Sequence, residues 1–199
     1  MAALNDSKIY LGSDLLIENS GGGGGGGGSD FIGIPRELTA QGVLQMPLSV
    51  TSYKLPEDVT DVGNYALAYA FYRCANLTSV DFTGLTDLSG DHAMYMAFTR
   101  TGVTTLNFPD LKTITGSMAL AYAFNGSAVT SVYFPALTSI GNDNTNQFSA
   151  MLLEIDHNCT VHFPSNMEAI LSPFINTTVG KRLGDPAKIT VLYDLTATA

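Results

Sequence analysis

Apolar positions between Tyr65 and Phe163 recur with a period of 26 or 27 residues. Each copy begins with a small apolar block that ends in Ala-Phe, and Phe71, Phe98 and Phe124 are 27 and 26 residues apart. A second block follows with fixed internal spacing. Its apolar positions are Leu77, Val80, Phe82, Leu85 and Leu88, then Val103, Leu106, Phe108, Leu111 and Ile114, then Val129, Val132, Phe134, Leu137 and Ile140. Such a period predicts stacked repeats that share one core.

Weaker copies flank these three. The upstream copy has apolar residues at Tyr53, Leu55, Val59 and Val62, and the downstream copy has them at Phe148, Val161, Phe163 and Ile170. The downstream copy carries a small insertion. Outer copies that match the pattern less well are expected in a solenoid, because its end units must cover the apolar core instead of extending it to a further repeat.

The second block of each copy predicts a short strand. In Ser79-Val80-Asp81-Phe82, strand alternation directs Val80 and Phe82 to one face and Ser79 and Asp81 to the other. Stacked copies then form a parallel sheet with two inner columns. These columns are Val80, Leu106, Val132 and Val161, and Phe82, Phe108, Phe134 and Phe163.

The first block of each copy is less decisive. Residues 66–71 and 119–124 are identical, and their alanines and leucines favour a helix. Six residues are too few to separate a short helical turn on the convex side from an irregular return. The fold class expected is therefore a β-rich solenoid with a parallel sheet and short irregular or helical returns.

The motif formed by these blocks resembles the BspA-like leucine-rich repeats. The matching residues are Ala70, Phe71, Cys74, Leu77 and Val80 in one repeat, and Phe108, Pro109, Leu111 and Ile114 in the next. The resemblance covers roughly residues 53–170 and implies a right-handed solenoid that binds through its sheet face. The family occurs in surface and adhesive proteins of bacteria, some protists and their phages. The motif cysteine survives only at Cys74, with Thr101 and Ser127 in its place, and a small buried side chain suits the position either way.

The segments outside the repeats suggest four parts. We expect an N-terminal anchor peptide in residues 1–20, a polyglycine linker in 21–29, a leucine-rich-repeat solenoid in 30–171 and a C-terminal cap in 172–199. Residues 8–12 and 14–17 suggest one strand or two. Residues 31–52 suggest an irregular lead-in. Lys188 to Tyr193 suggests a final strand that caps the solenoid or pairs with another chain.

Eight consecutive glycines, Gly21 to Gly28, make up most of the linker. A glycine tract has no side chains to bury and the largest backbone entropy, so alone it is a flexible tether. In the alternative, tracts from several chains pack together as extended polyglycine in an oligomer, since the missing Cβ permits close approach.

Composition and charge narrow the classes of partner. The net charge is −9 and only 14% of residues are charged, with no basic patch, which argues against nucleic acid. No apolar run is long enough to predict membrane insertion. The N-terminus lacks the features of a signal peptide, so we expect no export by the ordinary secretory route. Cys74 and Cys159 lie in different repeats and are expected to be reduced core thiols.

No catalytic or metal-binding pattern emerges. His157 and His162 flank Cys159, but the spacing matches no tetrahedral ligand set, and His162 is expected to be a solvated surface residue. The glycine tract lacks the lysine of a phosphate-binding loop. We therefore expect a protein that is not an enzyme and has no cofactor or metal.

Any binding site is expected on the outward side of the sheet. One outward row changes chemistry from repeat to repeat and comprises Lys54, Asp81, Asn107, Tyr133 and His162. The adjacent row consists of small hydroxyl residues, Ser79, Thr105, Ser131 and Thr160. A variable row on a rigid frame suits recognition, and a hydroxyl row suits bonding between strands. In the alternative, both rows are solvated or covered by a neighbouring subunit.

An anchor-like peptide, a glycine tract and the missing signal sequence together are similar to small accessory proteins of tailed phages. The resemblance implies a structural virion protein, made in the host cytoplasm, that acts as a head or tail fibre or decoration. Its N-terminal peptide would contact other virion proteins, its solenoid a host-surface protein or glycan, and the chain would form a homo-oligomer. The alternative is a bacterial cell-surface adhesin that binds host protein or glycan.

Overall fold

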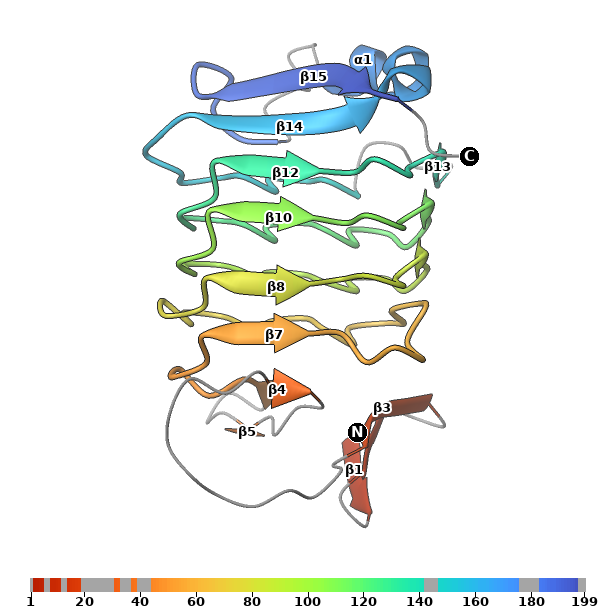
Figure 1. The fold of residues 1–199 in the computed structure, drawn as a ribbon, viewed down its shortest axis with the longest axis vertical. Helices are drawn as coiled ribbons and strands as arrows, with labels where there is room; N and C mark the ends of the chain where they lie inside the picture. Colours follow the sequence, from red (N-terminus) through yellow and green to blue (C-terminus); the bar gives the residue numbers. More distant parts are fainter. Residues whose placement is uncertain are drawn as a thin grey trace.

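A computed structural model describes residues 2–5, 8–11, 14–18, 31–32, 37–38, 44–141, 147–175 and 183–196. Through most of this length the chain winds into stacked turns and forms a β-solenoid with parallel sheets (Figure 1). Helix is limited to the 3-10 turn η1 (Ser165–Met167) and the helix α1 (Glu168–Ile175) within the described residues. The prediction of a stacked, β-rich repeat is confirmed.

The longest strands of the solenoid stack along one side. They are β7 (Ser52–Lys54), β8 (Ser79–Asp81), β10 (Thr105–Asn107), β12 (Ser131–Tyr133), β14 (Cys159–Pro164) and β15 (Ile189–Leu195). Hydrogen bonding divides them into two parallel sheets, ordered β4-β7-β8 and β10-β12-β14-β15, where β4 is Phe31–Ile32. Leu106 pairs with Val132, and Val132 pairs with Val161, as the predicted inner column requires.

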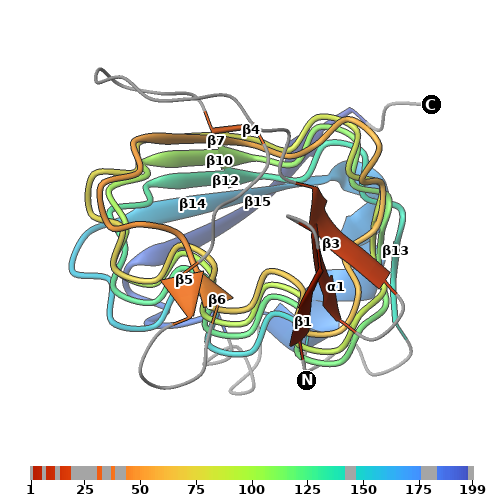
Figure 2. The ribbon, with the colours of Figure 1, turned by 90° about the horizontal axis from the view of Figure 1, so that it is seen from below.

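A second side carries a narrower parallel sheet. Its strands are β9 (Asp87–Leu88), β11 (Thr113–Ile114) and β13 (Ser139–Ile140), in the order β13-β11-β9. Leu88, Ile114 and Ile140 follow one another in register and point into the core. Viewed along the stack, successive turns trace almost the same outline (Figure 2). Each repeat therefore adds one layer to a continuous core.

The third side, which we call the turn face, is formed by residues 63–75, 90–102, 116–128 and 147–155. It is a chain of tight turns, and the helical alternative is wrong. Ala70 donates its N–H to Leu67 three residues earlier (3.1 Å), whereas Phe71 donates to Ala97 in the next turn of the solenoid (2.9 Å). The same alternation continues along the segment. Because every second N–H bonds to a neighbouring turn, a helical ladder cannot form.

Left-handed backbone accompanies this alternation. Among the described residues, ten non-glycine residues have φ between 52° and 61°, and all of them lie on the turn face: Tyr65, Tyr69, Arg73, His92, Met96, Arg100, Met118, Tyr122, Ala150 and Glu154. Each such residue costs roughly 1–2 kcal/mol relative to a right-handed conformation. Hydrogen bonds to adjacent turns of the solenoid accompany these conformations.

Two columns of stacked rings fill the core. Phe82, Phe108, Phe134 and Phe163 form the predicted column, with successive centroids 5.0, 5.1 and 5.3 Å apart. A second column joins Phe71 to Phe98 at 4.9 Å and Phe98 to Phe124 at 5.7 Å. All seven rings are fully buried. Burial of such a side chain contributes about 1.5–3 kcal/mol. Because each ring packs against rings of the adjacent repeats, the repeats stabilise one another.

The side chain at the motif position of Cys74 is small and buried in each repeat. Thr101 and Ser127 are buried there, and their hydroxyls donate to the carbonyls of Phe98 (3.0 Å) and Phe124 (2.8 Å). Both cysteines are free and buried, as expected. Burial raises the pKa of Cys74 to about 11 and that of Cys159 to about 12. The thiols therefore behave as small core side chains.

The ends of the chain differ in detail from expectation. The first residues form three strands, β1 (Ala2–Asn5), β2 (Lys8–Leu11) and β3 (Asp14–Glu18), in an antiparallel sheet, where one or two strands were expected. Two short strands, β5 (Glu37–Leu38) and β6 (Leu44–Gln45), pair in the lead-in. The glycine tract lies outside the described residues.

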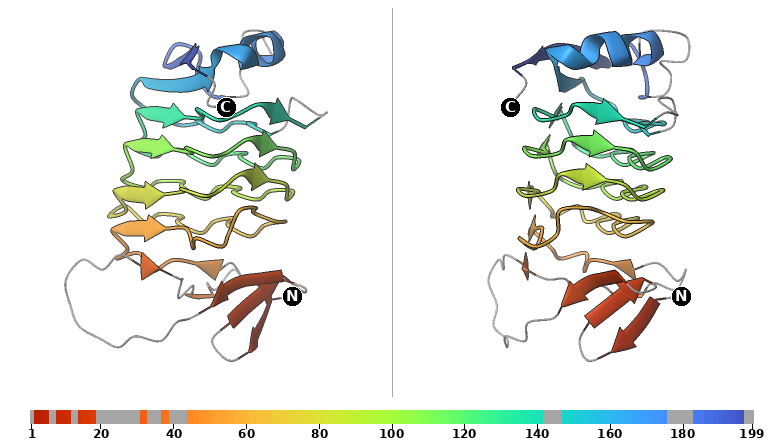
Figure 3. Two further views of the ribbon diagram at one scale, coloured as in Figure 1. Left: turned by 45° about the vertical axis from the view of Figure 1, so that its right-hand side comes forward. Right: turned by 90° about the vertical axis from the view of Figure 1, so that its right-hand side faces the viewer.

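At the other end, α1 runs across the predicted boundary between residues 171 and 172. Ile170, expected to continue the repeat phase, belongs to this helix. The predicted final strand is confirmed as β15, which pairs with β14 in parallel. Figure 3 shows α1 and β15 together at the end of the stack.

Candidate functional site

The five residues predicted to form the outward row lie at equivalent positions of successive strands. Lys54 pairs with Asp81 across β7 and β8, Asn107 pairs with Tyr133, and Tyr133 pairs with His162. Adjacent strands of a sheet are about 4.8 Å apart, so neighbouring members of the row are within side-chain reach. We call this set the sheet-face row.

The C-terminal half of the row is a small cluster. The rings of Tyr133 and His162 stack with centroids 4.4 Å apart and an interplanar angle of 11°. His162 Nδ1 lies 2.9 Å and 3.0 Å from the two carboxylate oxygens of Asp194 on β15. The His162 side chain is only 14% exposed, against 46% for Asp194. His162 lies at the predicted outward position and is partly exposed, with Tyr133 and Asp194 against its ring.

The charged side chains in the N-terminal half of the row interact with residues close to them in sequence. Lys54 Nζ lies 3.1 Å from Glu57 Oε1, in an exposed pair that contributes little to stability. Asp81 accepts a hydrogen bond from the Thr83 N–H at 2.9 Å. Hydrogen bonds from the Thr83 side chain and backbone lower the pKa of Asp81, and Lys54 lowers it further. The row therefore changes from charged groups at one end to an aromatic pair at the other.

The second outward row has the predicted register. Ser79 pairs with Ser52, and Thr105, Ser131, Thr160 and Thr190 follow one another across β10, β12, β14 and β15. This hydroxyl row extends one strand further at each end than the sequence pattern indicated. It gives the sheet a uniform polar border beside the variable row.

Sequence reasoning missed a group of rings on the turn face, which we call the tyrosine cluster. It comprises Tyr65, Tyr69, Tyr72, His92, Tyr95 and Tyr122. Tyr65 and His92 stack at 4.8 Å and 5°, while Tyr95 meets Tyr69 and Tyr122 edge-on at 5.5 and 5.8 Å. Tyr65 is 52% exposed. Tyr69 and Tyr122 occupy the same place in the two Ala-Tyr-Ala-Phe segments, and that spacing was the available signal.

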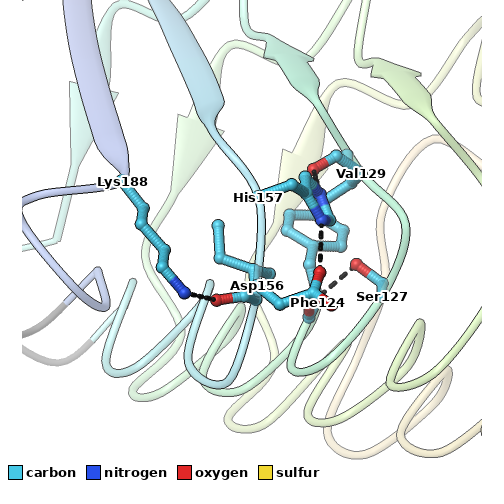
Figure 4. Close-up of polar contacts among 7 residues, drawn as sticks. Phe124, Ser127, Val129, Asp156, His157 and Lys188 are labelled. Carbon is cyan, nitrogen blue, oxygen red and sulfur yellow. Dashed lines mark hydrogen bonds and ion pairs between the residues drawn. The ribbon is translucent and has the colours of Figure 1, made fainter.

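His157 takes part in a contact between turns of the solenoid. Its Nε2 lies 2.8 Å from the Val129 carbonyl and its Nδ1 lies 2.9 Å from Asp156 (Figure 4). Nearby, Lys188 Nζ donates to the Ile155 carbonyl at 2.9 Å. The hydrogen bond to Asp156, and then that to Val129, raise the pKa of His157. Nε2 thus links this turn to the previous one, while Nδ1 contacts the adjacent residue of the same turn.

Among residues whose positions the structure describes, no three His, Cys, Asp or Glu side chains are grouped so that they could hold a metal ion. In the same part of the chain, no helix has the length and apolar character needed to cross a membrane.

Comparison with known proteins found no matching family model, no match among curated proteins and no match among solved structures.

Proposed function

We propose that this protein is a non-enzymatic attachment protein that binds its target through the sheet-face row. The observation that carries the proposal is the contrast between the two sides of the same strands. Inward, the column of Phe82, Phe108, Phe134 and Phe163 repeats one residue type. Outward, the sheet-face row changes residue type at every strand. Packing requires the first pattern and places no demand on the second, so the second is free to serve recognition.

The chemistry of the row favours a polar ligand of low charge. The Tyr133–His162 pair offers an aromatic surface with hydrogen-bonding edges, flanked by the exposed Asn107 and the half-exposed Asp194 carboxylate. A saccharide or a polar peptide presents complementary groups. Asp81, Asp194 and the net charge of −9 disfavour nucleic acid, because phosphate binding needs clustered cations.

We place this attachment protein in a phage virion, as a head or tail fibre or decoration with BspA-like leucine-rich repeats. The N-terminal peptide would contact other virion proteins, and the glycine tract would space it from the solenoid. The order of a short N-terminal segment, a glycine tract and a repeat domain supports this setting, because it is similar to the arrangement of small accessory proteins of tailed phages. The alternative setting is a bacterial cell surface, with the same face binding host protein or glycan.

Binding to immobilised glycans and bacterial envelope polysaccharides tests the sheet-face row. We expect the full chain to bind at least one of them, and Tyr133→Ala and His162→Ala each to weaken that binding about tenfold or more, as truncation of a central contact does. Thr138→Ala is the matched control, because Thr138 is exposed beside the narrow sheet. Equal binding by all four proteins would exclude this face as the site.

The setting is tested separately. Antibody labelling of purified particles and of bacterial cells distinguishes the two locations. Labelled particles support the virion assignment. Labelled cells with unlabelled particles favour the adhesin and leave the binding face unaffected.

A further inference from the structure

The strand β15 ends the sheet at the C-terminal end of the stack. Within the described residues it is the last strand in the order β10-β12-β14-β15 (Figure 1). It is seven residues long, and residues 189–195 contain no proline or lysine and a single charge, at Asp194. Proteins usually protect an edge strand with proline, lysine or other charged residues, because the unpaired N–H and C=O groups of such a strand can pair with a strand of another chain.

The pairing of β15 with β14 determines which backbone N–H and C=O groups of β15 point away from β14. Cys159 pairs with Ile189, and its N–H donates to the Lys188 carbonyl at 2.9 Å. In a parallel ladder, alternate residues direct their backbone groups to opposite sides. Thr190 and Leu192 therefore direct their backbone groups toward β14, whereas Val191 directs its groups toward the open edge. The register shifts between His162 and Pro164, so this alternation is established only as far as Leu192.

The side chains of β15 alternate as well. Ile189, Val191 and Tyr193 pack against the core, and the outward positions are Thr190, Leu192 and Asp194. Leu192 is 39% exposed and is one of the few large apolar side chains exposed on the described surface. It lies beside His162 and so continues the sheet-face row by one strand.

We propose that β15 pairs antiparallel with β15 of a second copy of this chain, about a two-fold axis at Leu192. This register places Leu192 opposite its own copy and Thr190 opposite the second copy's Asp194. The apolar pair is shielded, and each hydroxyl can donate to a carboxylate. Val191, whose backbone groups face the open edge, lies opposite the second copy's Tyr193 in this register.

Other registers are less complementary. An axis at Asp194 would bring two carboxylates together, and an axis at Tyr193 would place Leu192 opposite Asp194. An axis at Val191 would pair Asp194 with Lys188, but it would place Leu192 opposite Thr190 and would not shield the apolar side chain. The Leu192 register is therefore the one that the side chains favour.

This pairing is independent of the attachment proposal, yet it affects the same surface. The row Tyr133, His162, Leu192 would continue into the corresponding row of the second copy. Two sheet-face rows would then form one bivalent surface, and bivalent attachment strengthens binding without any new contact within a site.

The mass of the full chain in solution tests the pairing. The chain is 21.1 kDa, so sedimentation equilibrium should give a species of twice that mass as concentration rises. Leu192→Lys places two ammonium groups face to face and should weaken dimerisation about tenfold or more, with an unchanged circular dichroism spectrum. A chain that stays monomeric at every concentration, or a folded Leu192→Lys variant that dimerises as well as the original, overturns the proposal.

Cross-linking tests the register. Opposite residues of a non-hydrogen-bonded antiparallel pair have Cα atoms about 4.5 Å apart, which a disulfide spans. Leu192→Cys should therefore form a covalent dimer on mild oxidation, whereas Thr190→Cys, opposite Asp194, should not. The buried Cys74 and Cys159 do not compete. Equal cross-linking of both variants, or of neither, overturns the Leu192 axis.

Discussion

The Cβ atom that Gly90 lacks would lie 1.9 Å from the carbonyl carbon of Gly63 in the preceding turn of the solenoid. The next glycine of the same column, Gly116, has the same relation to the Gly90 carbonyl oxygen, also at 1.9 Å. Backbone thus approaches backbone at one corner of every repeat, where no flexible side chain can yield. We expect Gly90→Ala to lower the free energy of unfolding by about 3 kcal/mol, measured by urea titration.

Gly63 provides the matched control for this substitution. It begins the same column, but a Cβ at Gly63 would meet nothing within 4 Å, and its φ is not left-handed. Gly63→Ala should therefore change stability by no more than about 0.5 kcal/mol. Similar losses for the two variants would show that close approach between turns is not the reason for the glycine at position 90.

The left-handed backbone at Glu154 leads to a prediction of increased stability. Glu154 has a φ of 59° and is exposed, and Gly126, with a φ of 57°, occupies the equivalent place one turn earlier. Glycine adopts this conformation without steric cost, although it adds entropy to the unfolded chain. Glu154→Gly should therefore stabilise the protein by about 0.5–1 kcal/mol and raise the thermal midpoint.

Glu154→Ala separates the backbone effect from loss of the carboxylate. Alanine retains the Cβ that makes the left-handed conformation unfavourable, so this variant should unfold at nearly the original midpoint. If alanine and glycine stabilised equally, the removed charge would be the cause.

The cysteines should be unreactive in the folded protein. Burial raises the pKa of Cys74 to about 11 and that of Cys159 to about 12, and the thiolate is the reactive form. At pH 8 roughly one Cys74 in a thousand is ionised, and access is blocked as well. A thiol reagent should label no cysteine in buffer and both in denaturant. Rapid labelling in buffer would show that a turn opens readily.

Two features of the fold were predictable because they depend on short-range alternation repeated in register. Val132 and Phe134 point inward because a strand directs alternate side chains to one face, and the 26- to 27-residue period places them next to their equivalents. The same argument located the sheet-face row. For these residues the local pattern and the stacked arrangement agree.

The turn face was not predictable from local preference. Ala119 and Leu120 favour a helix, but their segment lies between two other turns, and hydrogen bonds across that stack replace the helical ladder. The contact of His162 with Asp194 was not predictable for a related reason. Its partner Asp194 lies on β15, which follows the last repeat, so the period contains no information about it.

The contact of His157 with two acceptors gives a prediction about pH. Hydrogen bonds to Asp156 and to the Val129 carbonyl raise its pKa, so the folded state favours the protonated ring. This stabilisation is complete below the unfolded value of about 6.5 and is lost as pH rises through the higher folded pKa. The wild-type protein should therefore gain stability relative to His157→Gln as pH falls from 8 to 6, as followed by urea titration at each pH.

Glutamine is the appropriate replacement because it keeps a donor for the Val129 carbonyl and cannot be protonated. The difference between the two proteins cancels the contributions of the other ionisable groups. A second variant, Asp156→Asn, removes the first cause of the raised pKa while it retains the imidazole. Its stability should depend less on pH than that of the wild type. A difference between wild type and His157→Gln that stays constant across the range would mean that His157 has the same pKa in the folded and unfolded states.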